Sequence, residues 1–262
     1  MSYSFRTAVY WYRRALAAVS GRRNLHFLHL RKTGGTAIKS LLVDHPVLPG
    51  WIIHCHPHRY VLADVPAVDD LMFVVRDPLE RYVSGFKSRQ NQGAPAHHVP
   101  WSDAERAAFA HFETAEALAL ALDPAASDHM LALKAMRNIS HLRCAYRDWF
   151  GSLEALEVRR HSIVFIGRTA RLDSDFAILR SALNMPPDMQ LPVDDRQSNR
   201  SGGGQGASML SEHAKVLLRA WYADDYRFMD WCDAWWKQQG GPVACRWLSA
   251  PDEAEKVVSE VI

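Results

Sequence analysis

Short apolar runs that alternate with helical patterns constrain the fold of this chain more than any other feature of its sequence. The runs at Trp51–His56, Leu71–Val75 and Ser162–Ile166 are rich in apolar residues, as strands buried on both faces are. An earlier run, Asn24–Leu30, has the same character. Helical patterns separate most of the runs, as in sheets whose strands are parallel. The sequence therefore predicts an α/β fold in which helices flank a central, mostly parallel sheet.

The clearest helix start follows the Leu71–Val75 run. Asp77 can cap the helix, Pro78 occupies its first position, and Glu80 stands where a capping box places its acidic residue. We expect this helix to run from Pro78 to about Arg89. Further helical patterns cover 104–122, 127–150, 173–184 and 210–238, whereas the stretches 91–103 and 185–208 contain glycine and proline and are expected to be loops.

The length of 262 residues suits one α/β domain with insertions, so we predict a single domain over 1–262. Within it we expect a helical insertion over 90–150 and an unassigned tail over 240–262. Hydrophobic residues make up 48% and charged residues 23%, which is typical of a globular protein with a buried core. The formal charge of +2 is too small to indicate nucleic-acid binding as the main task, although it permits a local basic pocket.

Residues 1–22 are expected to form an amphipathic helix with aromatic residues at positions 10–12. Arg13 and Arg14 interrupt its apolar stretch, whereas a membrane-spanning helix needs about 18 or more uncharged residues and a signal peptide needs an unbroken apolar stretch. We expect the helix to pack on the domain, and contact with a membrane surface is the alternative.

The four cysteines form no C-x-x-C pair and match no zinc-binding spacing, which favours reduced thiols in a reducing compartment. The predicted location is therefore the cytoplasm, with a peripheral position at the inner face of a membrane as the alternative.

A glycine-rich turn, L-R-K-T-G-G-T-A over Leu30–Ala37, follows the first apolar run and opens a helix. Gly34 and Gly35 allow the backbone to turn tightly and to approach an anion, which the N–H groups and dipole of the helix start attract. Lys32 adds a positive charge. In a nucleotide-hydrolysing P-loop the lysine follows the glycines, so the match to ATPases and GTPases is poor. A turn without any ligand is the alternative.

A second segment, V-R-D-P-L-E-R-Y-V-S-G-F, follows the Leu71–Val75 run. Arg76 closes the predicted strand, and Ser84 lies about two helical turns after Asp77. An arginine fork and a hydroxyl on one face suit a phosphate monoester. Arg76 paired with Asp77 or Glu80 is the structural alternative, and Arg81 fits a structural role well.

These two segments, in this order and spacing, resemble those of sulfotransferases that use 3′-phosphoadenosine 5′-phosphosulfate (PAPS). In that family the first segment binds the 5′-phosphosulfate and the second binds the 3′-phosphate, and the fold is a P-loop-like, three-layer α/β fold. The resemblance implies that Arg76 and Ser84 hold the 3′-phosphate. It also implies that Asn199 and Arg200 lie in a loop that covers PAPS. The residues implied for the 5′ side are Arg31, Lys32, Thr33, Gly34, Gly35, Thr36 and Ala37.

Sulfuryl transfer to an alcohol requires a group that takes the hydroxyl proton, most often histidine. The stretch H-C-H-P-H ends the second apolar run, and alternation places His54, His56 and His58 on one face unless Pro57 ends the strand. The H-x-H resembles that of uronyl and heparan 2-O-sulfotransferases, in which a histidine of this pair is the base. The resemblance implies His56 as the base, with His54 second, and a carbohydrate hydroxyl as the acceptor.

Other interpretations of the histidines stay open. An H-x-H at a strand end also suits zinc or another metal. The two histidines can instead be structural, with Glu80 or Glu113 as the base. In the sulfotransferase interpretation Lys32 is catalytic, because it stabilises charge on the leaving phosphate, and no metal is required. The insertion over 90–150 then lies on the acceptor side, where His97, His98 and Trp101 can contact a sugar.

Two other functions compete with a sulfotransferase. An ATP- or GTP-dependent kinase would bind its nucleotide with Mg²⁺, but the sequence lacks a convincing Walker lysine. A non-catalytic protein would bind 3′-phosphoadenosine 5′-phosphate (PAP), or another anion, without turnover.

Overall fold

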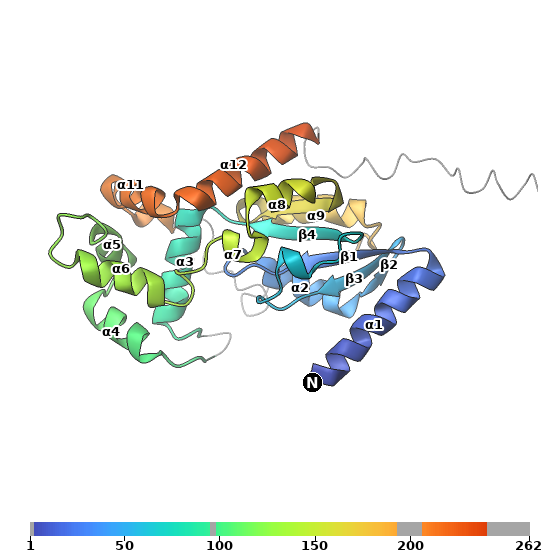
Figure 1. Cartoon of the computed structure of the whole chain (residues 1–262), viewed down its shortest axis with the longest axis horizontal. Coiled ribbons are helices and arrows are strands. Elements are labelled where there is room, and N and C mark those ends of the chain that lie inside the picture. Colours follow the sequence, from blue (N-terminus) through green and yellow to red (C-terminus); the bar gives the residue numbers. More distant parts are fainter. Residues whose placement is uncertain (1–2, 95–97, 193–205, 240–262) are drawn as a thin grey trace, which may run out of the picture.

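A computed structural model describes residues 3–94, 98–192 and 206–239. Its centre is one five-stranded sheet in the order β2-β3-β1-β4-β5 (Figure 1). Strands β3, β1, β4 and β5 are parallel, and the short β2 pairs antiparallel with β3. This architecture confirms the predicted α/β class and the mostly parallel sheet between helices. The strands are β1 (Arg23–Leu28), β2 (Val47–Leu48), β3 (Trp51–Cys55), β4 (Asp70–Val75) and β5 (Ile163–Arg168).

The strands form where the sequence is most apolar. All six residues of β4 are buried, as expected of a strand covered on both faces. Strand β1 ends at Leu28, two residues before its predicted end, because the chain then turns into the glycine-rich loop. Strand β5 extends past its predicted end to Arg168, since Val75 of β4 still pairs with that residue.

Helices cover both faces of the sheet (Figure 1). On one face α2 (Gly35–Asp44) and α9 (Leu172–Ala182) pack against alternate residues such as Phe27 and Val74. On the opposite face α7 (Arg147–Phe150), α8 (Leu153–Val158) and α12 (Ala223–Gln238) pack against residues such as Phe73.

A further group of helices gathers at one end of the molecule (Figure 1). They enclose an apolar cluster that includes Phe86, Phe109 and Leu218. The predicted helix over 104–122 breaks before Thr114, whose hydroxyl accepts a hydrogen bond from the Ala117 N–H and starts a new helix. These helices are α3 (Pro78–Gln90), α4 (Asp103–His111), α5 (Ala115–Leu120), α6 (His129–Asn138) and α11 (Glu212–Trp221).

The start of α3 matches its predicted capping only in part. The Asp77 side chain accepts hydrogen bonds from the N–H groups of Leu79 and Glu80, at 2.9 and 3.1 Å. The Glu80 carboxylate, however, accepts a bond from the Ala207 N–H at 2.9 Å and faces Arg76. Glu80 therefore joins two distant segments instead of closing a capping box.

A buried ion pair joins α3 to α12. Arg81 and Asp225 contact each other directly and are 3% and 2% exposed. The Arg81 guanidinium also lies over the rings of Tyr146 and Tyr222, and the Asp225 carboxylate accepts a bond from the Tyr146 N–H at 2.7 Å. Because a buried charge without a partner costs several kcal/mol, each member holds the other in place. Arg81 thus has the structural role that its sequence position predicted.

The N-terminal helix α1 (Tyr3–Ser20) packs on β1 and β3, as the sequence predicted (Figure 1). Arg13 donates a hydrogen bond to the Ile53 carbonyl at 3.2 Å, and Arg14 pairs with Asp69. Trp11 and Tyr12 point outwards and are 61% and 68% exposed. Among the helices in the described ranges, none is both long and apolar enough to cross a membrane.

Candidate functional site

The predicted binding segments meet at the carboxyl edge of the sheet. The connection after β1 leads to β3 on one side, whereas the connection after β4 leads to β5 on the other. In parallel sheets, ligands bind in the crevice where the connections diverge in this way. Lys32 follows β1 and Arg76 follows β4, so both residues lie at this crevice, and the Arg76 Nη1 is 3.4 Å from the Lys32 carbonyl oxygen.

The loop after β1 turns sharply before α2 begins. Lys32 has a φ of 62° and Gly34 a φ of 78°, so the backbone turns twice through the left-handed region before α2 begins. No side chain caps the first turn of α2, so its N–H groups can turn to an anion. The Thr33 hydroxyl donates to the Leu30 carbonyl at 3.2 Å, which ties it to the loop.

Gly35 is required by close packing at the helix start. A Cβ atom at this position would lie 2.9 Å from the His29 ring and 3.1 Å from the Phe27 ring. Thr36 lies beside the same His29 ring, with its hydroxyl 3.5 Å from the Nε2 atom, and Ala37 is fully buried. The loop therefore sits directly on the end of β1.

Arg76 is held rigidly at the end of β4. The Tyr146 hydroxyl donates to the Arg76 carbonyl at 2.6 Å and accepts from the Arg76 N–H at 2.9 Å. The guanidinium lies 3.5 Å from the Glu80 carboxylate. Glu80 and Ser84 are four residues apart on α3, and the Ser84 side chain is buried. Glu80 thus connects Arg76, which precedes α3, with the helix face that carries Ser84.

Two cations share this crevice. Burial, and then the charge of Arg76, lowers the pKa of Lys32 from its usual value to about 8. Burial likewise lowers the pKa of Arg76, although Glu80 partly offsets the effect. Two positive charges that are close together and partly buried favour binding of an anion. The anion would reduce the repulsion between the two side chains and would replace the water that they lose on burial.

Thr169 joins the three strand ends and was not identified from the sequence. Its hydroxyl lies 2.6 Å from the Thr33 carbonyl and 3.1 Å from the Val75 carbonyl, so it ties the loop after β1 to the end of β4. Its methyl group packs 3.4 Å from the position of a Cβ on Gly34. A threonine directly after an apolar strand was the only signal that could have indicated this role.

The predicted base His56 belongs to a buried hydrogen-bonded chain. Its Nε2 lies 2.9 Å from the Nδ1 of His26, and the His26 Nε2 lies 3.1 Å from the Asp69 carboxylate. The His56 ring also stacks on Tyr60 with ring centres 3.5 Å apart. His26 is completely buried and His56 is 8% exposed, so the whole chain is enclosed in the fold and His56 has only a small accessible surface.

This chain fixes where the protons of both rings lie. Hydrogen bonds from His26 and Arg14 hold the pKa of Asp69 below its usual value in spite of burial, so the carboxylate only accepts. His26 must then carry its proton on Nε2. Burial lowers the pKa of His26, and that of His56 to about 2, so both rings are neutral. The His26 Nδ1 therefore accepts the Nε2 proton of His56, which leaves the His56 Nδ1 with a free lone pair.

His54 has a different environment from His56. It stands opposite His26 in the parallel pairing of β1 and β3, and its Nε2 is 2.9 Å from the Asn24 side-chain oxygen. The ring of Tyr10 from α1 packs edge-on against it, and His54 is only 3% exposed. This arrangement leaves little access for an acceptor to His54.

His58 and His141 lie close to Lys32 and Arg31. Strand β3 ends before Pro57, and His58 turns towards β1, where its Nδ1 donates to the His29 carbonyl at 2.6 Å. Burial lowers the pKa of His141 to about 3, and Lys32 and Arg31 contribute to the shift. Burial is also the main reason for the lowered pKa of His58, with smaller effects from the Arg31 and Lys32 charges. Sequence reasoning included His58 in the histidine run but gave no role to His141.

The alternative bases are differently placed. The Glu80 carboxylate is engaged with Arg76 and Ala207, and Glu113 contacts Gln90 through its backbone carbonyl. Within the part of the chain that the structure describes, no group of three or more His, Cys, Asp or Glu side chains converges to hold a metal. Asn199, Arg200, His97 and the tail over 240–262 lie outside the described residues.

Comparisons of the chain with protein-family models, with curated proteins and with solved structures found no match.

Proposed function

We propose that this protein is a sulfotransferase, which moves the sulfuryl group of PAPS to a hydroxyl acceptor. The observation that carries the proposal is the meeting of Lys32 and Arg76 at one crevice, with 3.4 Å between the Lys32 carbonyl oxygen and the Arg76 guanidinium. The two segments are separated in the sequence, and a nucleotide with phosphate groups at both its 3′ and 5′ positions requires two such anion sites. The proposal includes a P-loop-like fold, a carbohydrate acceptor and a cytoplasmic location.

Each binding residue has a defined task in this proposal. Lys32 and the free N–H groups of the α2 start hold the 5′-phosphosulfate. Arg76, directly after β4, and Ser84, on α3, hold the 3′-phosphate. When the 3′-phosphate binds, the Arg76 guanidinium exchanges its 3.5 Å contact with Glu80 for a shorter, bidentate contact with the phosphate.

The reaction is a direct displacement at sulfur. The acceptor oxygen forms a bond to sulfur while the bond from sulfur to the phosphate oxygen breaks, so PAP leaves with the bonding electrons. Lys32 and the loop N–H groups stabilise the negative charge that grows on the leaving oxygen. The acceptor proton passes to the free lone pair of the His56 Nδ1. The Lys32 pKa of about 8 leaves most of this side chain charged at neutral pH, as the task requires.

The histidine chain explains how a weakly basic His56 can accept a proton. With a pKa of about 2 the isolated ring is a poor base. When the Nδ1 takes up a proton, however, the positive charge on His56 is shared through His26 with the Asp69 carboxylate. Such a carboxylate stabilises an imidazolium without becoming protonated itself. The negative charges of bound PAPS also stabilise the protonated form of His56.

Binding of PAP by the purified full chain is the first test. We expect PAP to raise the melting temperature without metal, and ATP with Mg²⁺ to have a much smaller effect. Lys32→Ala should weaken PAP binding strongly, whereas Lys134→Ala, an exposed lysine on α6, should not change it. A stronger response to ATP with Mg²⁺ than to PAP would favour a kinase and reject the proposal.

Transfer of labelled sulfate from PAPS to a panel of hydroxyl acceptors is the second test. We expect His56→Ala to lower turnover by about 10² to 10⁴-fold while PAP still binds. His58→Ala is the matched control, because His58 lies near Lys32 but donates its Nδ1 proton to a backbone carbonyl. Loss of turnover in the His58 variant alone would move the base to His58. PAP binding without transfer to any acceptor would instead indicate a non-catalytic protein.

A further inference from the structure

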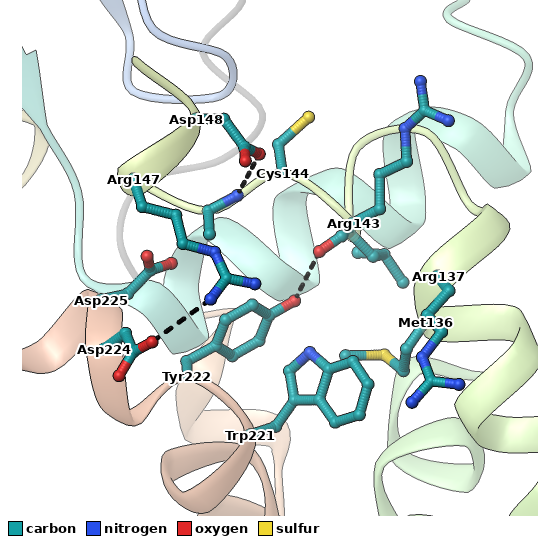
Figure 2. A pocket seen from close by; sticks show the side chains of 12 residues that line it. Met136, Arg137, Arg143, Cys144, Arg147, Asp148, Trp221, Tyr222, Asp224 and Asp225 are labelled. Atoms are coloured by element: carbon teal, nitrogen blue, oxygen red, sulfur yellow. Dashed lines mark hydrogen bonds and ion pairs between the residues drawn. The ribbon is translucent and has the colours of Figure 1, made fainter. Parts of the chain in front are cut away.

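A pocket of about 680 Å³ opens between the helices at one end of the molecule (Figure 2). Its walls come from the end of α6, from the segment between α6 and α7, and from the junction of α11 and α12. The volume lies within the range of pockets that hold small organic ligands. None of the residues that line it belongs to the set that holds the proposed nucleotide.

Aromatic and apolar side chains form the floor of this pocket. Met136, Leu142 and Tyr222 are buried, and the half-buried Trp221 presents its indole beside them (Figure 2). The Tyr222 hydroxyl donates to the Leu142 carbonyl at 3.1 Å, which fixes the position of this ring. Such a floor suits the flat face of a ring, because aromatic and apolar side chains stack against it.

The acidic residues that line the pocket are all engaged within the protein. Asp148 accepts a hydrogen bond from the Ala145 N–H at 2.9 Å. Asp224 faces Arg147 at 3.5 Å and also pairs with Arg227. Asp225 is the buried partner of Arg81. Arginines therefore balance the charges of Asp224 and Asp225, whereas Asp148 keeps its negative charge.

Two arginines that line the pocket have no acidic partner among the residues that the structure describes. In the described ranges, the guanidinium groups of Arg137 and Arg143 make no ion pair, and both side chains are exposed at the rim. Their two positive charges exceed the one negative charge of Asp148, so the net charge available to a ligand is positive. An arginine fork binds carboxylate, sulfate or sulfonate groups well because its donors match their paired oxygens.

We propose that this pocket is a second ligand site, which binds a ring-bearing organic anion with its ring on Trp221 and Tyr222 and its acidic group at Arg137 or Arg143. The residues that line it differ from those of the proposed nucleotide site, and the proposal does not rest on sulfuryl transfer.

Calorimetric titration of the full chain with naphthalene-2-sulfonate tests the proposal. The probe combines a flat ring with one anionic group, and naphthalen-2-ylmethanol is its uncharged counterpart. We expect saturable binding of one sulfonate per chain, and binding of the alcohol weaker by at least about tenfold, because a charge-assisted hydrogen bond is lost. No saturable binding of the sulfonate, or equal affinity for both probes, would overturn the proposal.

Variants locate the bound probe. Changing both Arg137→Gln and Arg143→Gln should weaken sulfonate binding by about tenfold or more without changing the affinity for the alcohol. Trp221→Leu keeps an apolar side chain but removes the aromatic face, so it should weaken both probes. Arg106→Gln, an exposed arginine on α4, is the matched control and should have no effect.

Lys32→Ala separates this proposal from the proposed nucleotide site. Sulfonate binding that persists in this variant, and that PAP does not displace, supports a second site whether or not the protein transfers sulfate. Sulfonate binding that disappears in Lys32→Ala but survives in the double arginine variant would place the probe in the crevice at the sheet edge. That result would overturn the proposal.

Discussion

At the scale of single residues, Lys32 combines an unusual backbone with an unusual charge. Its φ of 62° lies in a region that costs a non-glycine residue free energy, and such residues are often found at functional sites. Its pKa is lowered to about 8 by burial and by Arg76, so the charge that would bind an anion is lost at mildly alkaline pH. The left-handed backbone and the lowered pKa thus occur at the loop residue for which the motif resemblance implies contact with the phosphosulfate.

We therefore predict that the affinity for PAP falls as the pH rises through about 8. Only the protonated form of Lys32 attracts the anion, so above its pKa each bound PAP must take up a proton, and the dissociation constant should rise up to about tenfold per pH unit. Titration calorimetry between pH 6.5 and 9.5 measures this dependence. Lys32→Arg is the control, because arginine stays charged and should give a flatter profile. An equally steep profile in both proteins would contradict the role of Lys32.

A second prediction concerns the carboxylate behind His56. Asp69→Asn keeps the shape of the side chain and an acceptor oxygen but removes the negative charge, so a proton on His56 loses its counter-charge. We expect turnover to fall by about tenfold or more while PAP affinity stays unchanged. Asp70→Asn is the matched control, since the neighbouring buried Asp70 pairs with Arg23 instead.

Nitrogen-15 NMR of the histidines gives a readout for this chain that needs no acceptor. In the native protein we expect a proton on the Nε2 atoms of His26 and His56, and none on their Nδ1 atoms. A protonated Nδ1 on neutral His56 would show that this atom cannot serve as the base.

At the scale of elements, the contact between α2 and β1 brings the start of α2 close to the proposed anion site. A third prediction follows for Gly35→Ala, whose new Cβ would meet the His29 ring at 2.9 Å and the Phe27 ring at 3.1 Å. Both rings are buried, so the helix must shift, at a cost of about 1–3 kcal/mol in the free energy of unfolding. We expect weaker PAP binding together with a lower urea midpoint.

Gly50→Ala provides the comparison for this substitution. Gly50 has a φ of 78°, so alanine is strained there, but nothing lies within 4 Å of the new Cβ and the turn is not part of the crevice. This variant should lose about 1–2 kcal/mol of stability and keep its PAP affinity. Equal loss of PAP affinity in both variants would mean that stability alone explains the effect.

The strands could be predicted from the local sequence, whereas one helix break could not. The strands were predicted because short, continuous apolar runs such as Leu71–Val75 are typical of strands that are buried on both faces of a sheet. The helix over 210–238 was predicted as continuous, but it breaks at Tyr222, whose hydroxyl bonds to Leu142 in another segment. That contact is tertiary, so the local helical pattern could not reveal the break.

The candidate site was predictable to the same degree. Lys32 and Arg76 could be brought together because strand ends in a parallel sheet share one edge. The link from His56 to Asp69 depends on the register that sets His26 opposite His54, and on a loop that lies between β3 and β4 in the sequence. The sequence contains no periodic signal for that register, so His26 and Asp69 were not identified in advance.

At the scale of the whole molecule, buried histidines make stability depend on pH. Burial lowers their pKa values in the folded protein, so the folded state keeps them neutral whereas the unfolded chain protonates them below about pH 6.5. Stability is therefore complete above that pH and is lost as the pH falls. The six histidines of the described residues with lowered pKa values are His26, His29, His54, His56, His58 and His141.

The fourth prediction is a steep loss of stability between about pH 6.5 and 5. Each histidine contributes up to about 1.4 kcal/mol per pH unit, and the carboxyls of Asp70, Asp175 and Asp225, whose pKa values are raised, oppose the effect but are fewer. Urea unfolding across this range measures the slope. His54→Phe should reduce it, whereas His98→Gln, at an exposed position, is the control. A stability that is constant down to pH 5 would contradict the buried neutral state of the cluster.

The Tyr146 hydroxyl makes hydrogen bonds with both the N–H and the carbonyl group of Arg76. These bonds matter for engineering this chain. Tyr146 belongs to the helical stretch between α3 and α8, so the backbone partners of Arg76, the arginine proposed to bind the 3′-phosphate, come from outside the sheet. A chimera that replaces this stretch with a foreign one must therefore supply a phenol at the same place. Without it, the end of β4 would keep an unsatisfied N–H and C=O, and the graft would alter nucleotide affinity even though every residue proposed to touch the nucleotide had been retained.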